Sequence, residues 1–370
     1  MSNMKKLLPL LLILSLVLVL AACGSGNNGK SANSGSGSSS SSSSSSSSAG
    51  GGTSGTADSG QSGESGEGKT IKVAMIPKAI GNSYFAAAAA GAEEAAKELN
   101  IDFVFNGPTE LDAAQQVSII NGYVAQGYDV LAISAIDPTA LVPALQEALK
   151  KGVHVITWDS DVQQEAREHY VNVATAEGIG SELARLASEK FSGQNVEAAV
   201  ISSTPTDPNQ IEWIGALEKA IQEKYSNISI VTTQYDYGDP ATSQALTSDV
   251  LKAYPNVKVI FATTSYAVPA AAEAVDKAGK KGEVYVTGLA NPDVVREYVK
   301  NGVVEQFVLW DVVKMGKLTM HVARAVADGT MPQSGTFKAG DLGEFELMGD
   351  NVMLGLPFVF NADNIDDYHF

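Results

Sequence analysis

Hydrophobic and polar positions alternate in blocks from about residue 70 to residue 328. Short apolar runs with β-branched residues, such as TIKVAMIP at residues 70–77, are separated by longer stretches rich in Ala, Leu, Glu and Lys. The short runs predict buried strands, and the longer stretches predict helices. Strands are expected at residues 70–77, 101–105, 130–134, 153–158, 197–202, 229–233, 257–263, 284–287 and 306–309. Helices are expected at residues 83–99, 111–126, 138–151, 177–191, 210–225, 241–254, 268–278, 292–300 and 312–328.

This alternation predicts an α/β fold with parallel sheets that are flanked by helices. Roughly 300 residues take part, which is more than one hydrophobic core usually serves, so we expect two domains. The segment LVPALQEA at residues 141–148 is echoed by AVPAAAEA at residues 267–274, and each precedes a strand. The echo indicates two similar Rossmann-like lobes that face each other across a cleft, although a chance likeness between Ala-rich helices is the alternative.

The N-terminal region has the features of an export signal. Two lysines precede an apolar run at residues 7–20, and LAACG at residues 20–24 matches the bacterial lipobox. Cys23 is the only cysteine of the chain, so we expect it to carry a lipid and not a disulfide. A secretory signal cut nearby is the alternative. We therefore expect a signal peptide at residues 1–22, a lipidated and disordered Ser/Gly tether at residues 23–69, and a protein held at the outer face of the cell membrane.

Charge and motifs exclude several function classes. The formal net charge of -17 argues against nucleic acid or an anionic membrane surface as a partner. No Gly-x-Gly-x-x-Gly follows the first strand, no Gly-x-Ser-x-Gly elbow is present, and the four histidines are scattered along the sequence. We expect no cofactor, no metal site and no catalytic residue.

The loops after the strands are the expected place for a site, because the carboxyl ends of parallel strands lie along one edge of a sheet. These loops are residues 78–85, 159–161, 204–210, 263–266 and 290–291. Four of their side chains offer donors and acceptors that suit a polyol: Lys78, Asp159, Asn209 and Gln210. Aromatic side chains in or beside the loops are candidates for packing on a sugar ring, with the core as the alternative for each: Tyr84, Phe85, Trp158, Trp213 and Trp310. Phe85 and Trp310 are favoured.

Asp159 and Asp161 are two residues apart. Strand alternation would place both carboxylates on one face, which suits acid/base or metal chemistry. The alternative, which we favour, is that one carboxylate binds ligand while the other is solvated or caps a turn. An exported sugar enzyme that uses Asp159 with Asp161 or Glu177 is the competing hypothesis.

Several motifs occur in the order and spacing of a known family. They are IPK at 76–78, GNSYF at 81–85, GPTE at 107–110, GYD at 127–129, TWDSD at 157–161, LWD at 309–311 and FN at 360–361. Together they resemble the periplasmic-binding-protein type I family, and within it the autoinducer 2-binding and rhamnose-binding branch. The resemblance implies a monomeric receptor that closes two lobes on a small ligand and delivers the ligand to an ABC permease without catalysis.

The resemblance also implies how the chain is divided. Three crossings between the lobes are expected near residues 173–176, 308–311 and 354–357. The expected N-terminal lobe is residues 70–174 with 310–340, and the expected C-terminal lobe is residues 175–309 with 341–370.

In the autoinducer 2 branch the site consists of a Lys, an Asp, an adjacent Asp-Gln pair, and a Pro and an Ala on one loop. Lys78 and Asp159 match, and Thr263 and Ser265 replace the Pro and the Ala. The Asp-Gln pair aligns either with Asn209-Gln210 or with Asp207-Pro208.

These departures favour a neutral sugar such as rhamnose or a pentose, with autoinducer 2 as the alternative. A sugar chemoreceptor that signals to a membrane kinase is a further alternative. The ligand-binding residues implied are Lys78, Tyr84, Phe85, Asp159, Asp207, Asn209, Gln210, Thr263, Ser265, Asn291 and Trp310.

Overall fold

The computed structural model describes residues 69–370. The expected signal peptide, Cys23 and the tether up to residue 68 lie outside the described residues.

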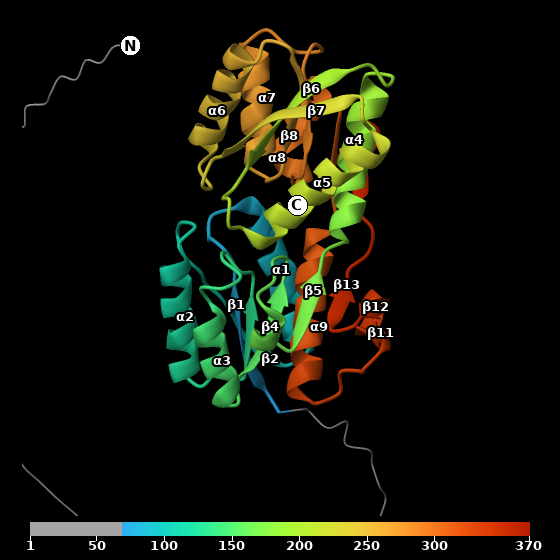
Figure 1. Cartoon of the computed structure of the whole chain (residues 1–370). Coiled ribbons are helices and arrows are strands. Elements are labelled where there is room, and N and C mark those ends of the chain that lie inside the picture. The colour runs from blue at the N-terminus through green and yellow to red at the C-terminus, as the bar shows by residue number, and fades with distance from the viewer. Residues whose placement is uncertain (1–68) are drawn as a thin grey trace, which may run out of the picture. The chain divides into compact units, whose positions relative to one another are not determined.

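The first lobe is built on an eight-stranded sheet in the order β11-β12-β13-β5-β4-β3-β1-β2 (Figure 1). Its parallel strands are β1 (Ile71–Ile76), β2 (Ile101–Phe105), β3 (Val130–Ile133), β4 (His154–Trp158), β5 (His169–Asn172) and β13 (Asn351–Met353). The antiparallel strands β11 (Gly335–Lys338) and β12 (Glu344–Met348) extend one edge of it. Its helices are α1 (Ser83–Glu98), α2 (Ala113–Ala125), α3 (Val142–Lys150) and α9 (Val312–Ala327).

The second lobe contains a four-stranded parallel sheet in the order β7-β6-β8-β9. Its strands are β6 (Val196–Ser202), β7 (Ile228–Tyr235), β8 (Val257–Ala262) and β9 (Tyr285–Gly288). A bridge between Leu289 and Val308 joins it to the antiparallel pair β10 (Gln306–Leu309) and β14 (Phe358–Asn361). Its helices are α4 (Ala176–Lys190), α5 (Pro208–Lys224), α6 (Pro240–Ala253), α7 (Ala267–Lys277) and α8 (Pro292–Lys300). Short 3-10 turns occur at Gln164–Ala166, Gly340–Leu342 and Ile365–Asp367.

Burial on both faces explains why the strands are continuous apolar runs. In β1, Val73 and Met75 belong to the core that includes α1 and α9, whereas Ala74 and Ile76 belong to the core that includes α2 and α3. Because successive side chains of a strand point to opposite faces, the sheet carries helices on both sides.

Helices α1 and α9 approach each other so closely that their backbones touch. A Cβ atom at Gly316 would lie 1.9 Å from the carbonyl oxygen of Ala88, and a Cβ at Gly91 would lie 2.1 Å from that of Val313. Only glycine fits at these two positions. Helix α1 starts where Asn82 Oδ1 accepts a hydrogen bond from the backbone N–H of Tyr84 at 2.9 Å, and this cap places the start of the helix at the end of β1.

The expected α/β fold with two parallel-sheet lobes is confirmed. Each expected strand and helix is present, with ends shifted by at most four residues. The chain passes between the two sheets after β5, after β10 and between β13 and β14, which agrees with the three expected crossings.

The expected lobe boundary at residue 340 is wrong. Strand β13 pairs in parallel with β5, and β12 pairs with β13, so residues 344–353 extend the sheet of the first lobe. The chain reaches the second lobe only after Met353, where β14 pairs with β10. None of the helices within residues 69–370 combines the length and apolar character that crossing a membrane requires.

Candidate functional site

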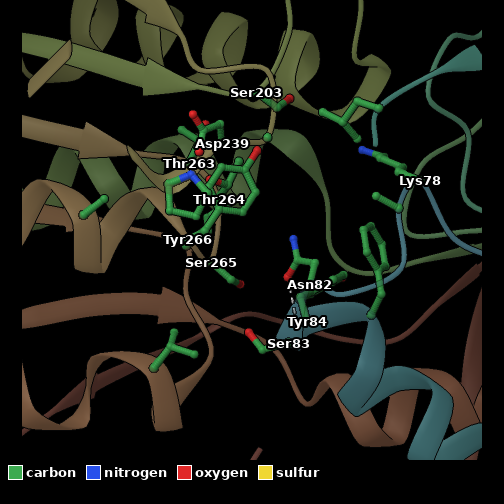
Figure 2. Close-up of a pocket in the computed structure, with 18 of the residues that line it drawn as sticks. Lys78, Asn82, Ser83, Tyr84, Ser203, Asp239, Thr263, Thr264, Ser265 and Tyr266 are labelled. Carbon is green, nitrogen blue, oxygen red and sulfur yellow. Dashed lines mark hydrogen bonds between the residues drawn. The ribbon is translucent and has the colours of Figure 1, made fainter. Parts of the chain in front are cut away.

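A cleft of about 1020 Å³ lies between the lobes, along the carboxyl ends of the strands. Ten of the eleven expected binding residues line it: Lys78, Tyr84, Phe85, Asp159, Asp207, Asn209, Gln210, Thr263, Ser265 and Trp310. Figure 2 shows Lys78 and the start of α1 on one side of the cavity, and Ser203 with Thr263 to Tyr266 on the other. The strand-end rule therefore located this cleft.

Lys78 connects the two lobes. Its Nζ atom lies 2.6 Å from Asp207 Oδ1 and 2.8 Å from Asn209 Oδ1, both of which belong to the second lobe. Asp159 Oδ2, in the first lobe, lies 3.9 Å away. Asp207 and Asn209 are the first residues of the two alternative alignments of the Asp-Gln pair. Both reach Lys78, because Asp207 is the N-cap position of α5 and Asn209 lies in its first turn.

Asp159 is held from several directions in the first lobe. Strand β4 ends at Trp158, and Asp159 has a positive φ of 62°, a conformation that few non-glycine residues adopt. Its Oδ1 atom accepts a hydrogen bond from the Tyr84 hydroxyl at 2.8 Å, and its Oδ2 atom accepts one from Ser134 Oγ at 2.7 Å. The Tyr170 hydroxyl donates to its backbone carbonyl at 2.8 Å.

Burial raises the pKa of Asp159, while Lys78 and the two hydroxyl donors act in the opposite direction. Burial and the neighbouring Asp159 also raise the pKa of Tyr84 well above its usual value, so this phenol stays protonated and donates to the carboxylate.

Asp161 does not share this site, and the prediction that it faces the same way as Asp159 is wrong. The positive φ of Asp159 ends the strand alternation on which the prediction rested. Asp161 instead accepts hydrogen bonds from Thr157 and from Arg167, whose Nη2 atom lies 2.7 Å from Asp161 Oδ2. Asp161 is therefore an ion-pair partner outside the cleft lining.

The polar groups of the second lobe are hydrogen-bonded to one another. Gln210 Oε1 accepts from Ser202 Oγ at 2.9 Å and from Thr263 Oγ1, and Gln210 Nε2 donates to the carbonyl of Thr263 at 3.3 Å. Ser203 Oγ donates to Asp207 Oδ2 at 2.7 Å. These contacts fix the amide and carboxylate orientations before any ligand arrives, which lowers the entropy lost on binding.

Asn291 does not line the cleft, in contrast to the expectation. It is fully buried, and its Oδ1 atom accepts from Ser265 Oγ at 3.1 Å. Its Nδ2 atom donates to the carbonyl of Ser83 in the first lobe at 3.3 Å. Asn291 therefore positions Ser265 and links the two lobes.

Aromatic side chains form the apolar wall of the cleft. Trp310 lies at a crossing between the lobes, and its Nε1–H donates to the Tyr84 hydroxyl at 3.0 Å. The Trp213 and Trp310 ring centroids are 5.5 Å apart, and both rings line the cleft with Phe85. Trp158 has no exposed surface and donates to the carbonyl of Ala132 at 3.1 Å, so it belongs to the core.

Sequence reasoning missed three parts of this site. Ser134, which holds Asp159, follows β3. The loop between β7 and α6 contributes Tyr237, Gly238 and Asp239 to the cleft, and Glu110 contributes from the loop after β2. Each follows the carboxyl end of a parallel strand, so the rule that found the other loops would have found these had it been applied to every strand.

The charges that line the cleft disfavour an anionic ligand. Lys78 is the only lysine or arginine among the lining residues, whereas five lining residues carry carboxylates: Glu110, Asp159, Asp207, Asp239 and Glu273. Within residues 69–370 no group of three or more His, Cys, Asp and Glu side chains is arranged to hold a metal ion.

Comparison with known proteins identifies the family. The model of the family described as a periplasmic binding protein domain matches residues 73–331. The D-ribose/D-allose-binding protein of Pseudomonas aeruginosa is 26% identical over 238 residues, which are 62% of this chain and 74% of that protein. LsrB from Clostridium saccharobutylicum in complex with AI-2 is 27% identical, with a TM-score of 0.78, and the match covers 81% of this chain and 100% of that one. An ABC transporter solute binding protein from Clostridium phytofermentas with bound L-rhamnose is 29% identical, with a TM-score of 0.77, over 81% of this chain and 98% of that one. Because the family model covers most of the folded region and the two lobes have the expected architecture, the chain belongs to the periplasmic-binding-protein type I family.

Proposed function

We propose that this protein is the extracytoplasmic substrate-binding component of an ABC importer, anchored through Cys23, that binds a small neutral sugar in the cleft and delivers it to a membrane permease. The observation that carries the proposal is the cluster of Lys78, Asp207, Asn209 and Asp159, which unites charged and amide groups of both lobes in one buried place. A ligand bound there contacts both lobes, so it stabilises the closed arrangement over an open one.

The charges of the cleft support a neutral ligand. Lys78 is 5% exposed and is already paired with Asp207, so it has no free charge to offer to a phosphate or a uronate. The carboxylates of the lining repel anions further. A sugar hydroxyl, in contrast, can donate to Asp159 or Asp207 and accept from Lys78 or from the Asn209 amide.

The apolar wall favours a sugar with a methyl group or an exposed C–H face. Phe85, Trp213 and Trp310 lie beside the polar cluster, so one side of a pyranose can meet apolar rings while its hydroxyls face the polar groups. A 6-deoxy sugar such as rhamnose, or a pentose, fits this division. The rhamnose-bound and ribose/allose-binding relatives support the same class.

Autoinducer 2 is the second candidate. Lys78, Asp159 and Asp207 meet in one cluster, and the similar LsrB structure was solved with AI-2. Thr263 and Ser265 argue against this ligand, because the resemblance implies apolar residues at both positions. Thr263 instead donates a hydrogen bond to Gln210.

Binding without catalysis is part of the proposal. The side chains that could serve as acid or base are engaged with each other, since Asp159 accepts from two hydroxyls and Asp207 accepts from Lys78 and Ser203. An NMR spectrum of each sugar after incubation with the protein should show the sugar unchanged, and any product would support the enzyme hypothesis instead.

The test is a ligand screen of the purified full chain by thermal shift and calorimetry. The panel contains L-rhamnose, L-arabinose, D-ribose and AI-2, with glucose 6-phosphate and galacturonate as anionic controls. A ligand at 100 times its Kd adds about 2.7 kcal/mol to the free energy of unfolding, which raises Tm by several degrees. We expect one neutral sugar to bind, neither anion to bind, and Asp159→Asn to weaken binding at least tenfold. Binding of AI-2 alone would establish the second candidate, and binding of an anion would contradict the charge argument.

A further inference from the structure

The cleft extends well beyond the polar cluster at Lys78. Pockets for drug-sized ligands span about 300–1,000 Å³, and this cleft, at about 1020 Å³, lies at the top of that range. A monosaccharide is smaller than such ligands. The lining continues outward from the polar cluster along the loop between β7 and α6 and along Thr109 to Leu111 of the first lobe.

Tyr237 stands out in this outer part of the cleft. It lines the cleft, the residue is 64% exposed, and its backbone has a positive φ of 54°. A positive φ is an outlier for a bulky residue, and such strain persists only where the surrounding structure enforces it.

The surrounding structure does enforce this conformation. The backbone N–H of Tyr237 donates to the carbonyl of Ser203 at 2.8 Å. The preceding Asp236 is 1% exposed, and its carboxylate accepts hydrogen bonds from the Gly238 N–H at 3.0 Å, from the Tyr266 hydroxyl at 3.2 Å and from Ser243. A buried carboxylate thus organises a turn that presents an exposed aromatic ring at the cleft.

The two lobes meet beside this ring. A Cβ atom at Gly238, which has a positive φ of 85°, would lie 3.2 Å from Leu111 Cδ1 of the first lobe. The loop at Gly238 and the loop at Leu111 therefore approach each other at this part of the cleft, and residues of both loops line it. Hydrogen-bonding side chains of this outer part include Glu110, Gln244 and Tyr266.

We propose that the Tyr237 loop and the facing loop at Thr109 to Leu111 form an outer subsite that holds a second neutral sugar ring, so that the preferred ligand is a disaccharide or a glycoside. The Tyr237 ring supplies an apolar face for the C–H side of that ring, and the carboxylate and amide groups accept and donate to its hydroxyls. The inference rests on the proposed function, because it places the first ring at the Lys78 cluster.

Calorimetry on the full chain tests the proposal with nine probes: L-rhamnose, L-arabinose and D-ribose, each as the free sugar, the methyl glycoside and the homodisaccharide. The methyl glycoside is the matched control, because it carries the glycosidic oxygen without a second ring. We expect the disaccharide of the sugar that binds to have a Kd at least tenfold lower than that of its methyl glycoside.

The variant Tyr237→Gly removes the ring and keeps a residue that adopts a positive φ without strain. In this variant the disaccharide and the methyl glycoside should bind with nearly equal Kd values, so the ratio of the two values is close to one. Tyr254→Ala, which alters a 37% exposed tyrosine at the other end of α6 and outside the cleft lining, should leave the ratio as in the parent.

Two results overturn the proposal. A disaccharide that binds no better than the methyl glycoside, while the free sugar binds, refutes the outer subsite and leaves the proposed function intact. An unchanged ratio in Tyr237→Gly removes Tyr237 from the subsite and refutes the proposal as stated. If none of the nine probes binds, the proposed sugar-binding function fails as well.

Discussion

Replacing Lys78 by methionine tests the central cluster, because methionine keeps an unbranched apolar stem and removes the charge. Asp159 and Asp207, each 3% exposed, would then lose the one lysine in contact with them. Removing one partner of a buried ion pair costs about 3–5 kcal/mol, because the other charge is left uncompensated. With an unfolding entropy of about 2.1 cal/mol/K per residue over roughly 300 folded residues, this loss corresponds to a fall in Tm of about 5–8 °C.

The decrease in the free energy of unfolding caused by Lys78→Met should depend on pH. Burial already raises the pKa of Asp159 above its usual 3.8, and Lys78 acts to lower it, so the variant has a still higher pKa at this carboxyl. A carboxyl whose pKa is higher in the folded state binds more protons when folded, and the free energy of unfolding then falls as pH rises from the unfolded value through the folded value. The difference in the free energy of unfolding between the parent and the variant is therefore larger at pH 7.5 than at pH 5.

Urea unfolding of parent and variant at both pH values measures this effect. Lys97→Met is the control, because Lys97 is 71% exposed and pairs only with Glu93 on the surface of α1, a contact worth about 0.5 kcal/mol or less. Adding Asp207→Asn to Lys78→Met removes a buried charge and should restore part of the loss. The reasoning is refuted if Lys78→Met costs no more than Lys97→Met, or if its cost is the same at both pH values.

Three further predictions concern the framework of the cleft. Burial raises the pKa of Asp236 from 3.8 to about 6, so titration of this carboxyl should lower the free energy of unfolding by about 2 kcal/mol between pH 4 and pH 6; urea unfolding across this range should show that Asp236→Asn removes this part of the pH dependence, and an unchanged pH dependence would contradict the assignment. Gly316→Ala should destabilise the protein by more than about 2 kcal/mol in urea unfolding, because its Cβ would lie 1.9 Å from a backbone oxygen of the facing helix. Gly215→Ala, in an exposed part of α5 with no atom within 4 Å of the new Cβ, should stabilise it by about 0.5–1 kcal/mol, and similar effects of the two changes would argue against the close helix contact. Tyr84→Phe leaves the indole N–H of Trp310 without its acceptor and removes the 2.8 Å hydrogen bond to Asp159 Oδ1, which then keeps only the 3.4 Å contact with Asn209 Nδ2; the change should cost at least about 2 kcal/mol in the same assay, whereas Tyr254→Phe on the surface should be neutral.

The sequence was sufficient to predict the strands and helices that form the two lobes. Runs such as residues 130–134 are apolar because helices cover both faces of the sheet. An apolar run can be recognised in the sequence without knowing which strands and helices pack against it. Strand β5 and strands β11 to β14 were not predicted, since each has three to five residues and is defined by its pairing and not by its own composition. The misplaced lobe boundary has the same cause, because β13 belongs to the first lobe only through its hydrogen bonds to β5.

The residues of the candidate site could be predicted from the strand ends and from residue chemistry, but the contacts between their side chains could not. Nothing local to Asp159 indicates a positive φ, so the sequence could not separate it from Asp161. Likewise, the sequence places Asp207 and Asn209 two residues apart, while only the close approach of the lobes brings both to Lys78. Contacts between side chains more than a hundred residues apart depend on the assembled lobes, and no motif encodes them by itself.

The placement of the tryptophans gives the protein a built-in optical reporter. The chain has three tryptophans and none lies in residues 1–68. Trp213 and Trp310 line the cleft, and Trp158 packs edge-on against the cleft residue Phe85 at 5.7 Å between ring centroids. Tryptophan emission therefore arises only from residues that lie in or beside the cleft. Quenching or a spectral shift of this emission on titration can therefore report binding in the cleft of the unlabelled, full-length protein.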